Sequence, residues 1–209
     1  RCVCVFKDAN PAAPPEERYK AIAQGTGGVR GIICMVSADG IQWRQLEPTP
    51  TIMPPKSDPA FDSPNIAFWD HWREEYAAYV RGWLSAPPEA LTPDFDYGHP
   101  GHRKTRTVRR TTSPDFRNWS EFKYLDLQLA LQPREQFYTN ATVAYERARA
   151  YFMFPMRFTH ERKFFPDWPH TGLSDIAFLS SRDGIHWDRS FKEAWLRPGE
   201  DDENWHERS

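Results

Sequence analysis

One short turn is repeated along the chain, and this repetition constrains the fold more than any other feature. The copies are SADGIQW from Ser37, SPDFRNW from Ser113 and SSRDGIHW from Ser180. The closing tryptophans of successive copies are 76 and 68 residues apart. A period of this length indicates one supersecondary unit repeated in tandem.

Four short runs rich in aromatic or β-branched residues accompany each copy of the turn. The first two runs of each unit are VFKDANP and RYKAIAQG, FDSPNIAFWD and EEYAAYVRGW, and FYTNATVAYE and RAYFMFPMRF. Tandem groups of four antiparallel strands are the signature of β-propeller blades. We therefore expect an all-β fold of four-stranded antiparallel blades, as a β-propeller.

Three blades are expected in the 209 residues, in approximate units 1–50, 51–125 and 134–195 of a single domain, 1–209. Propellers have roughly four to eight blades, so we expect further blades outside this chain, in a propeller of five. The sequence opens inside an expected strand, RCVCVF, and stops at NWHERS. Both ends are accordingly expected to be cut from a longer protein, and they do not indicate a cellular location.

The repeated turn itself has a structural explanation. Gly supplies the positive φ that a tight hairpin requires, and Ser and Asp side chains bond backbone amides within such turns. The tryptophan can fill the gap to the neighbouring blade. Asp39, Asp115 and Asp183 are therefore interpreted as turn residues and not as catalytic acids.

The charge balance disfavours nucleic acid and membranes as partners. Lys and Arg total 27 against 29 Asp and Glu, a net charge of −2, which gives no basic footprint for anionic polymers or lipid surfaces. No stretch approaches the length of apolar sequence that spans a bilayer. Phosphate-binding and nucleophile-elbow motifs are also missing from the sequence, and the oligomeric state is not indicated.

The cysteines and histidines predict neither a metal site nor a cofactor. Cys2, Cys4 and Cys34 lack the spacing of a disulfide framework or a zinc ribbon and are expected to be small buried strand residues. His99 and His102 lie in a Gly- and Pro-containing loop without a nearby Cys or carboxylate, which is a weak pattern for a metal. We expect His102 at the rim of the cavity, in contact with substrate.

Asp8, Asp62 and Asn140 occupy what the repeat suggests are matching positions on the first strands of the three units. The first strand of each propeller blade lines the central channel, so these side chains are expected to converge on one cavity. Glycoside hydrolysis uses such a pair of carboxyl groups. The alternative is that Asp8 and Asp62 form ordinary Asx turns beside prolines.

Two segments resemble known enzymes. FKDANP and FDSPNIAFWDHWREEYAAYVRG are similar to the first- and second-blade segments of the five-bladed propeller glycosidases of families 32 and 43. The whole chain resembles a group of uncharacterised glycosidase-like proteins related to them, through RYKAIA, SADGIQW, FLSSRDGIHW and RPGEDDENWHERS. The resemblance implies that Asp8 acts as base or transition-state stabiliser and that Asp62 tunes the catalytic acid.

The third unit departs from these families, which usually carry a Glu where this chain has Asn140. An amide cannot donate a proton as a general acid. Glu135 lies five residues upstream and Glu146 six downstream. We take Glu135 as the candidate acid, while an acid from a missing blade, or none, remains open. The sequence gives no support for the channel Ca²⁺ that some related glycosidases hold.

Further candidates for substrate contact are Arg81, Arg157 and Trp69. Arg81 and Arg157 follow the apolar core of the second strand in their units and could bond sugar hydroxyls or a carboxylate, or form inter-blade ion pairs. Trp69 could stack on a sugar ring or pack in the core.

The sequence therefore predicts a propeller glycosidase that hydrolyses a glycosidic bond by acid/base catalysis. The second hypothesis is a carbohydrate-binding propeller without catalysis, suggested by Asn140. A third, a scaffold that recognises protein, is weaker because the cavity positions are polar and acidic.

Overall fold

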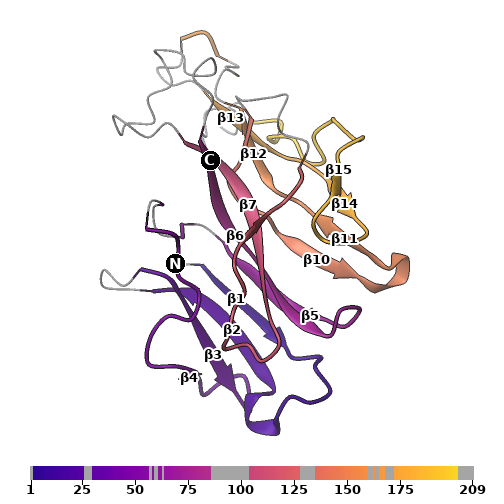
Figure 1. The fold of residues 1–209 in the computed structure, drawn as a ribbon. Coiled ribbons are helices and arrows are strands. Elements are labelled where there is room, and N and C mark those ends of the chain that lie inside the picture. Colours follow the sequence, from indigo (N-terminus) through magenta and orange to yellow (C-terminus); the bar gives the residue numbers. More distant parts are fainter. Residues whose placement is uncertain are drawn as a thin grey trace. The chain divides into compact units, whose positions relative to one another are not determined.

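The computed structural model describes residues 2–25, 30–56, 58, 61–62, 64–85, 104–127, 135–159, 162, 165–167 and 172–201. They form β-strands and the short 3-10 helices η1 (Pro15–Glu17) and η4 (Glu146–Ala148), with no α-helix in these ranges (Figure 1). Within the same ranges, no helical segment has the length and apolar character needed to cross a bilayer. The all-β fold expected from the sequence is confirmed.

The chain divides into two compact units, and the first contains a complete four-stranded sheet. Unit 1 comprises residues 1–81 and 109–124, and unit 2 comprises residues 82–108 and 125–209. The sheet of unit 1 has the order β1-β2-β3-β4 and is antiparallel throughout. Its strands are β1 (Val3–Lys7), β2 (Tyr19–Gln24), β3 (Ile32–Ser37) and β4 (Arg44–Gln45).

The second sheet has the order β5-β6-β7-β8. Its strands are β5 (Ile66–Asp70), β6 (Glu75–Ser85), β7 (Lys104–Ser113) and β8 (Lys123–Tyr124). In unit 1, β5 contacts β1, and the Cys4 Sγ lies 3.5 Å from the backbone nitrogen of Ala67. Contact between the first strands of successive sheets is the arrangement expected of propeller blades.

A third four-stranded sheet, in unit 2, has the order β10-β11-β14-β15. Its strands are β10 (Thr142–Tyr145), β11 (Ala150–Met153), β14 (Leu179–Ser181) and β15 (Trp187–Asp188). In each of the three four-stranded sheets the strands lie side by side in the order in which they occur along the chain, although β12 and β13 intervene in the chain between β11 and β14. This pattern confirms the four-stranded blades that the repeat predicts.

A small fourth sheet, with the order β13-β12-β9, was not expected from the sequence. It contains β9 (Glu135–Phe137), β12 (Met156–Thr159) and β13 (Leu173–Ile176). The run RAYFMFPMRF is divided at Pro155, which has no backbone N–H for a ladder. The Pro155 carbonyl still accepts a hydrogen bond from the Ala177 amide at 3.0 Å, so the paired strands continue past the break into this small fourth sheet.

The repeated turn has the same geometry in all three copies. The Oδ1 atoms of Asp39, Asp115 and Asp183 each accept the backbone N–H groups two and three residues ahead, at 2.7–2.8 Å. Burial of the Asp115 carboxyl opposes its ionisation, yet these amide bonds lower its pKa to about 2. The structural interpretation of the turn acids is confirmed.

Phe116 differs from the residues at the same position of the other two turns. Gly40 and Gly184 have φ of 79° and 75° there, and Phe116 has φ of 63°. Positive φ is strained for a bulky residue. Burial of the Phe116 ring offsets this strain, because the residue is 0% exposed and its ring centroid lies 5.1 Å from that of Tyr76. Phe116 belongs to the apolar core of unit 1.

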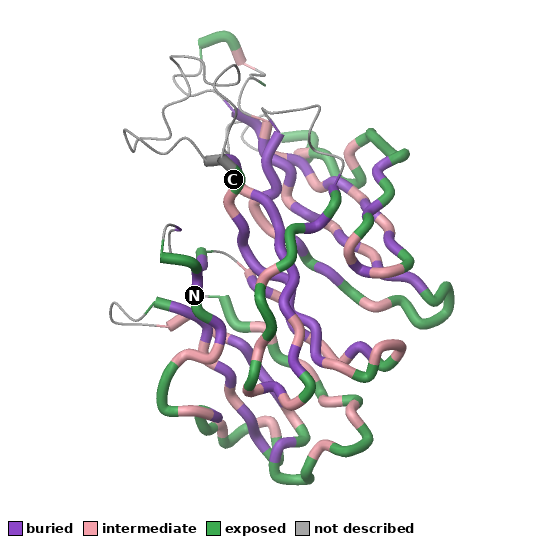
Figure 2. Tube along the Cα trace, viewed as in Figure 1, coloured by how far each residue is buried: buried purple, intermediate pink, exposed green. Residues whose placement is uncertain are grey.

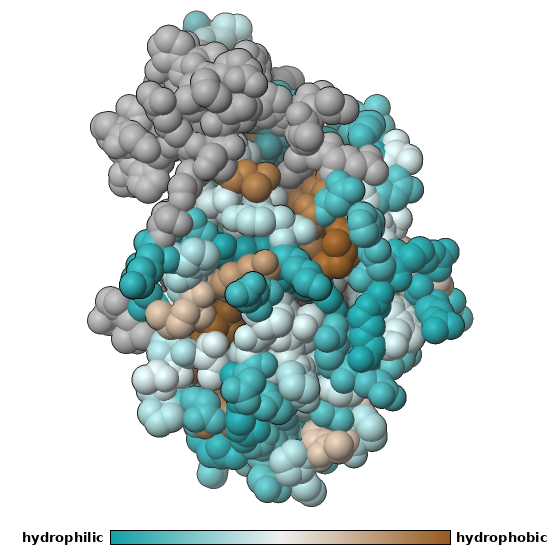
Figure 3. All heavy atoms as spheres, viewed as in Figure 1, coloured by the Kyte–Doolittle hydropathy of each residue, from teal (hydrophilic) through white to brown (hydrophobic). Residues whose placement is uncertain are grey.

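Burial follows the strands, and exposed residues gather in the turns (Figure 2). The visible face in Figure 3 is mostly hydrophilic, with small separate hydrophobic areas. This matches a chain in which 27% of the residues are charged.

Candidate functional site

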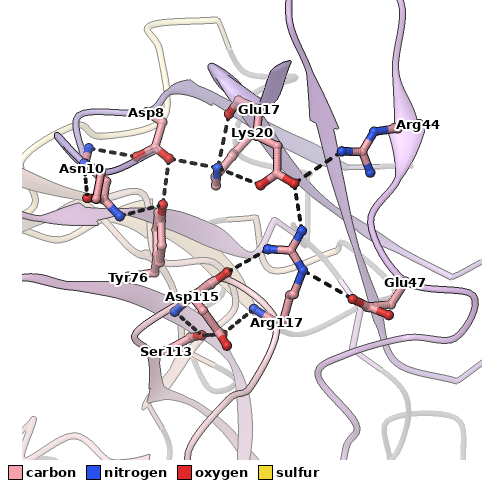
Figure 4. Close-up of polar contacts among 11 residues, drawn as sticks. Asp8, Asn10, Glu17, Lys20, Arg44, Glu47, Tyr76, Ser113, Asp115 and Arg117 are labelled. Atoms are coloured by element: carbon pink, nitrogen blue, oxygen red, sulfur yellow. Dashed lines mark hydrogen bonds and ion pairs between the residues drawn. The ribbon is translucent and has the colours of Figure 1, made fainter. Parts of the chain in front are cut away.

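Asp8 directly follows β1, and its side chain is 0% exposed (Figure 4). Its Oδ2 lies 2.9 Å from the Lys20 Nζ and accepts the Tyr76 hydroxyl at 2.6 Å. Its Oδ1 accepts the Asn10 backbone N–H at 2.9 Å. Both carboxylate oxygens therefore have partners, and no part of the side chain reaches the surface.

Lys20 is the cation that balances this buried carboxylate. Its side chain is 1% exposed, and its Nζ donates to the Glu17 carbonyl at 3.1 Å and lies 3.5 Å from the Glu17 Oε2. The rings of Tyr76 and Phe116 have their centroids 5.5 Å and 5.6 Å from the same nitrogen. Carboxylates and aromatic faces together compensate for the loss of water around the ammonium.

Glu17 connects Lys20 to arginines nearer the surface. The Glu17 Oε1 accepts from Arg117 at 2.7 Å and from Arg44 at 3.2 Å. Arg117 also pairs with Glu47 at 3.3 Å. Burial of Glu17 works against its ionisation, but the hydrogen bond and charge of Arg117, helped by Lys20, lower its pKa below the ordinary value.

Tyr76 is held in its neutral form. Burial raises the pKa of Tyr76 well above the ordinary value, and the hydrogen bond to Asp8 raises it further. Asn10 donates to the Tyr76 oxygen from Nδ2 at 3.1 Å, so the hydroxyl remains a donor to Asp8. We call Asp8, Asn10, Glu17, Lys20 and Tyr76 the Asp8 network; it joins β1, η1, β2 and β6.

Asp62 has a different environment from Asp8. It precedes β5 by four residues and is exposed. The neighbouring Asn65 is buried, and its Oδ1 accepts the Arg81 backbone N–H at 3.1 Å. The structure thus places Asp62 at the surface beside a backbone that is fixed by a side-chain hydrogen bond.

The matched positions assumed for Asp8 and Asp62 are wrong. Asp8 follows the end of β1, whereas Asp62 precedes the start of β5. Tyr76, which bonds Asp8, pairs with Trp69 near the end of β5. The two carboxylates therefore lie toward opposite ends of β5.

Asn140 lies between β9 and β10, two residues before β10. It is 2% exposed, and its Oδ1 accepts the Thr142 hydroxyl at 2.9 Å and the Thr142 backbone N–H at 3.2 Å. Asn140 and Asp62, both upstream of a first strand, are the better match in topology. The assumed correspondence of Asn140 with Asp8 is wrong, because Asn140 precedes its first strand, β10, whereas Asp8 follows β1.

Glu135 and Arg157 lie together in the small sheet of unit 2. The Glu135 Oε1 lies 3.5 Å from the Arg157 Nη1, and the Oε2 lies 2.5 Å from the Arg189 Nη2. Arg157 also forms a bidentate pair with Asp175, at 2.6 Å and 2.7 Å. Arg162 pairs with Asp175 at 2.6 Å. We call these five residues the Glu135 cluster.

Glu135, Arg157 and Asp175 lie on the three strands of the small sheet, whereas Arg162 and Arg189 reach the Glu135 cluster from outside those strands. Arg157 on β12 is the direct register partner of Asp175 on β13. The hydrogen bonds that Arg157 donates to Asp175 are the main reason that the pKa of Arg157 is raised. Both Glu135 oxygens contact arginine nitrogens, so Glu135 is poorly placed to protonate a leaving group.

The remaining predicted residues have less distinctive surroundings. Arg81 is 3% exposed within β6. Trp69 is half-buried, with its ring 4.8 Å from that of Tyr76 in an edge-to-face contact, and it packs against the core of unit 1. His102 lies outside the described residues. Within the described ranges, no group of three or more His, Cys, Asp or Glu side chains could hold a metal ion.

Sequence reasoning missed Lys20, Tyr76, Asp175 and Arg189. Lys20 had a detectable signal: in the run YKAIAQ it shares a strand face with Ile22, and a lysine on an apolar face requires a carboxylate partner. Arg189 had no such signal, since its contact with Glu135 spans 54 residues.

Comparison with known proteins gives structural neighbours only. No protein-family model matches the sequence, and no curated protein matches it either. A solved structure described as a glycoside hydrolase has a TM-score of 0.55 at 12% identity, covering 96% of this chain and 59% of its own.

Two further neighbours carry more specific descriptions. The GH32 β-fructofuranosidase of Bombyx mori has a TM-score of 0.53 at 11% identity, over 81% of this chain and 31% of its own. The GH93 α-L-arabinofuranosidase of Fusarium graminearum, solved with arabinobiose, has a TM-score of 0.52 at 12% identity, over 88% and 47%. The chain thus spans between a third and three fifths of these neighbours, and its fold is that of glycoside hydrolases.

Proposed function

We propose that this chain forms part of a protein that hydrolyses a glycosidic bond. The observation that carries the proposal is the fold, which matches glycoside hydrolases over most of the chain. Fold by itself does not define chemistry, so the proposal also needs a carboxylate that a substrate can reach.

Asp62 fits that requirement better than Asp8. Asp62 is exposed at the start of β5, whereas the Asp8 oxygens are enclosed and already paired. In this proposal Asp62 is the carboxylate that assists attack at the anomeric carbon. Glu135 is not the general acid in this proposal, because both of its oxygens contact arginine nitrogens.

The test uses sucrose, arabinobiose and a panel of aryl glycosides, with release of reducing sugar or aglycone as the signal. Asp62→Asn should lower turnover by about 10²–10⁴-fold, the usual loss for a proton-transfer group, and leave the melting temperature unchanged. Asp167→Asn, another exposed carboxylate in the described chain, is the matched control. Full turnover in Asp62→Asn would reject the role of Asp62.

A second candidate is a carbohydrate-binding propeller without hydrolysis. It is favoured by the surroundings of Glu135, both of whose oxygens contact arginine nitrogens, and by the sequence resemblance, which implies an acid where this chain has Asn140. Calorimetric binding of an oligosaccharide without bond cleavage over long incubation would support this candidate against the hydrolase.

A further inference from the structure

A pocket of about 540 Å³ lies in unit 1, away from the Asp8 network. This volume is in the range of small-molecule sites. Its walls are formed by the segment after β4 and by the residues around β8, and most of them are apolar or aromatic: Met53, Pro54, Pro55, Trp119, Phe122 and Tyr124. The polar residues that line it include Arg109 on β7 and Glu121.

Arg109 is buried and only partly satisfied. It is 1% exposed, and its Nη1 bonds the Asp58 Oδ2 at 2.8 Å. The guanidinium lies over the ring of Phe122, with 4.2 Å from Cζ to the centroid. Its Nε and Nη2 have no hydrogen-bond partner among the residues that the structure describes. Buried donors of this kind normally have one.

The two unsatisfied nitrogens define the chemistry of the missing acceptor. The N–H groups of Nε and Nη2 lie side by side along one edge of the guanidinium plane, with the spacing of the two oxygens of a carboxylate. Asp58 occupies only Nη1, so this edge remains available. A carboxylate is therefore the acceptor that satisfies both donors together.

The aromatic wall indicates what carries that carboxylate. Tyr124 is 45% exposed and is the register partner of Arg109 across β7 and β8. Tyrosine and tryptophan present flat apolar faces with a polar tip, and such faces suit the ring of a sugar. The exposed Glu121 carboxylate at the rim would repel a bound anion, but solvent and salt weaken this repulsion because Glu121 is exposed.

We infer that this pocket binds a sugar that bears a carboxylate, such as a hexuronic acid, with the acid on the Nε and Nη2 edge of Arg109 and the ring against Tyr124. The choice of a sugar rests on the proposed function, whereas the choice of a carboxylate rests on Arg109 alone. Both nitrogens are buried, so binding requires a lining side chain to shift. Met53, which is 53% exposed and unbranched, can move at low cost.

Calorimetry with D-galacturonate, D-galactose and benzoate tests this inference on the full chain. We expect galacturonate to bind about tenfold or more tightly than galactose, because galactose lacks the charge that pairs with the guanidinium fork. Tyr124→Ala should weaken galacturonate binding about fivefold or more by removing the stacking face. Tyr145→Ala, at an aromatic residue 39% exposed in unit 2, is the matched control.

Arg109→Lys keeps the charge and removes the fork, so it should also weaken binding by about tenfold. Because Arg109 is buried, the melting temperature of this variant is measured first; if it unfolds, Tyr124→Ala still decides. Equal affinity for galactose and galacturonate, tighter binding of benzoate, or unchanged affinity in Tyr124→Ala would each overturn the inference. Binding that survives in Asp62→Asn, with no hydrolysis in any variant, would support the pocket and reject the hydrolase.

Discussion

The Asp8 network and the Glu135 cluster solve the same problem, buried carboxylates, in different ways. In the first, one lysine, 1% exposed, faces Asp8 and Glu17. In the second, Arg157, Arg162 and Arg189 share two carboxylates. The Asp8 network thus has a single cation at its centre, whereas the Glu135 cluster has more cations than anions.

The difference shows which network tolerates change. Removing one partner of a buried pair leaves an uncompensated charge, which is far more costly than the pair itself is worth. Within the part of the chain that the structure describes, Lys20 is the cation that pairs with Asp8, while Asp175 retains Arg162 if Arg157 is lost. Arg162 is 48% exposed, so the Glu135 cluster also reaches water. Four measurements sharpen or break this contrast.

Lys20→Met is expected to have the largest effect. It leaves the Asp8 carboxylate buried without a cation, and the expected loss is about 3–5 kcal/mol in the free energy of unfolding. Urea denaturation followed by tryptophan fluorescence measures it. Lys123→Met, at an exposed lysine of β8, is the control and should change stability little. A loss from Lys20→Met as small as that of the control would contradict the account.

Arg157→Met should have a smaller effect, about 2 kcal/mol, because it removes hydrogen bonds to a charged group while other arginines remain. The same denaturation experiment applies, with Lys192→Met as an exposed control. If Arg157→Met matched Lys20→Met in its cost, the redundancy of the Glu135 cluster would be disproved.

Tyr76→Phe removes one hydrogen bond to Asp8 and keeps the ring contacts with Trp69 and Phe116. The expected cost is about 1.5 kcal/mol, the lower end for a bond to a charged group. Tyr145→Phe, at an exposed tyrosine, serves as the control. An unchanged free energy of unfolding would mean that the hydroxyl does not stabilise the Asp8 carboxylate.

The acid limb of stability should depend on Glu17. Its folded pKa is lowered, so its contribution is fully present above the unfolded value of about 4.3 and is lost as the pH falls through the folded value. Glu17→Gln should therefore flatten the decline in stability below about pH 4.5. Glu16→Gln, at an exposed neighbour, should keep the wild-type slope, and an identical slope in Glu17→Gln would exclude this role.

The fold was predictable because its strongest signal is local. The turn Ser-x-Asp, followed by Gly in two copies and by Phe116 in the third, encodes its own hydrogen bonds within a few residues, so three copies predicted three similar sheets. The β9-β12-β13 sheet was not predictable in the same way. This sheet depends on Pro155, which interrupts the hydrogen bonds between paired strands, and on the pairing of β12 with β9. Contacts between residues far apart in the sequence decide this pairing.

The candidate site was predicted only in part. Glu135 and Arg157 were chosen separately, and the structure brings them together. Asp8 and Asp62 were taken as equivalent because each follows an aromatic-rich run and precedes the expected second strand of its unit, but the sequence does not show at which end of the first strand such a residue lies. Lys20 pairs with the buried Asp8 carboxylate. This contact depends on tertiary packing, so the sequence alone did not predict it.

The central claim is that Asp8 is an internal structural anion and that Asp62 is an accessible carboxylate. Thermal unfolding of Asp8→Asn and Asp62→Asn, measured side by side, tests it most directly. The account predicts a melting temperature lowered by about 4–8 °C for Asp8→Asn, from a loss of about 2 kcal/mol, and no change for Asp62→Asn. Unchanged melting of Asp8→Asn together with a large drop for Asp62→Asn would contradict it.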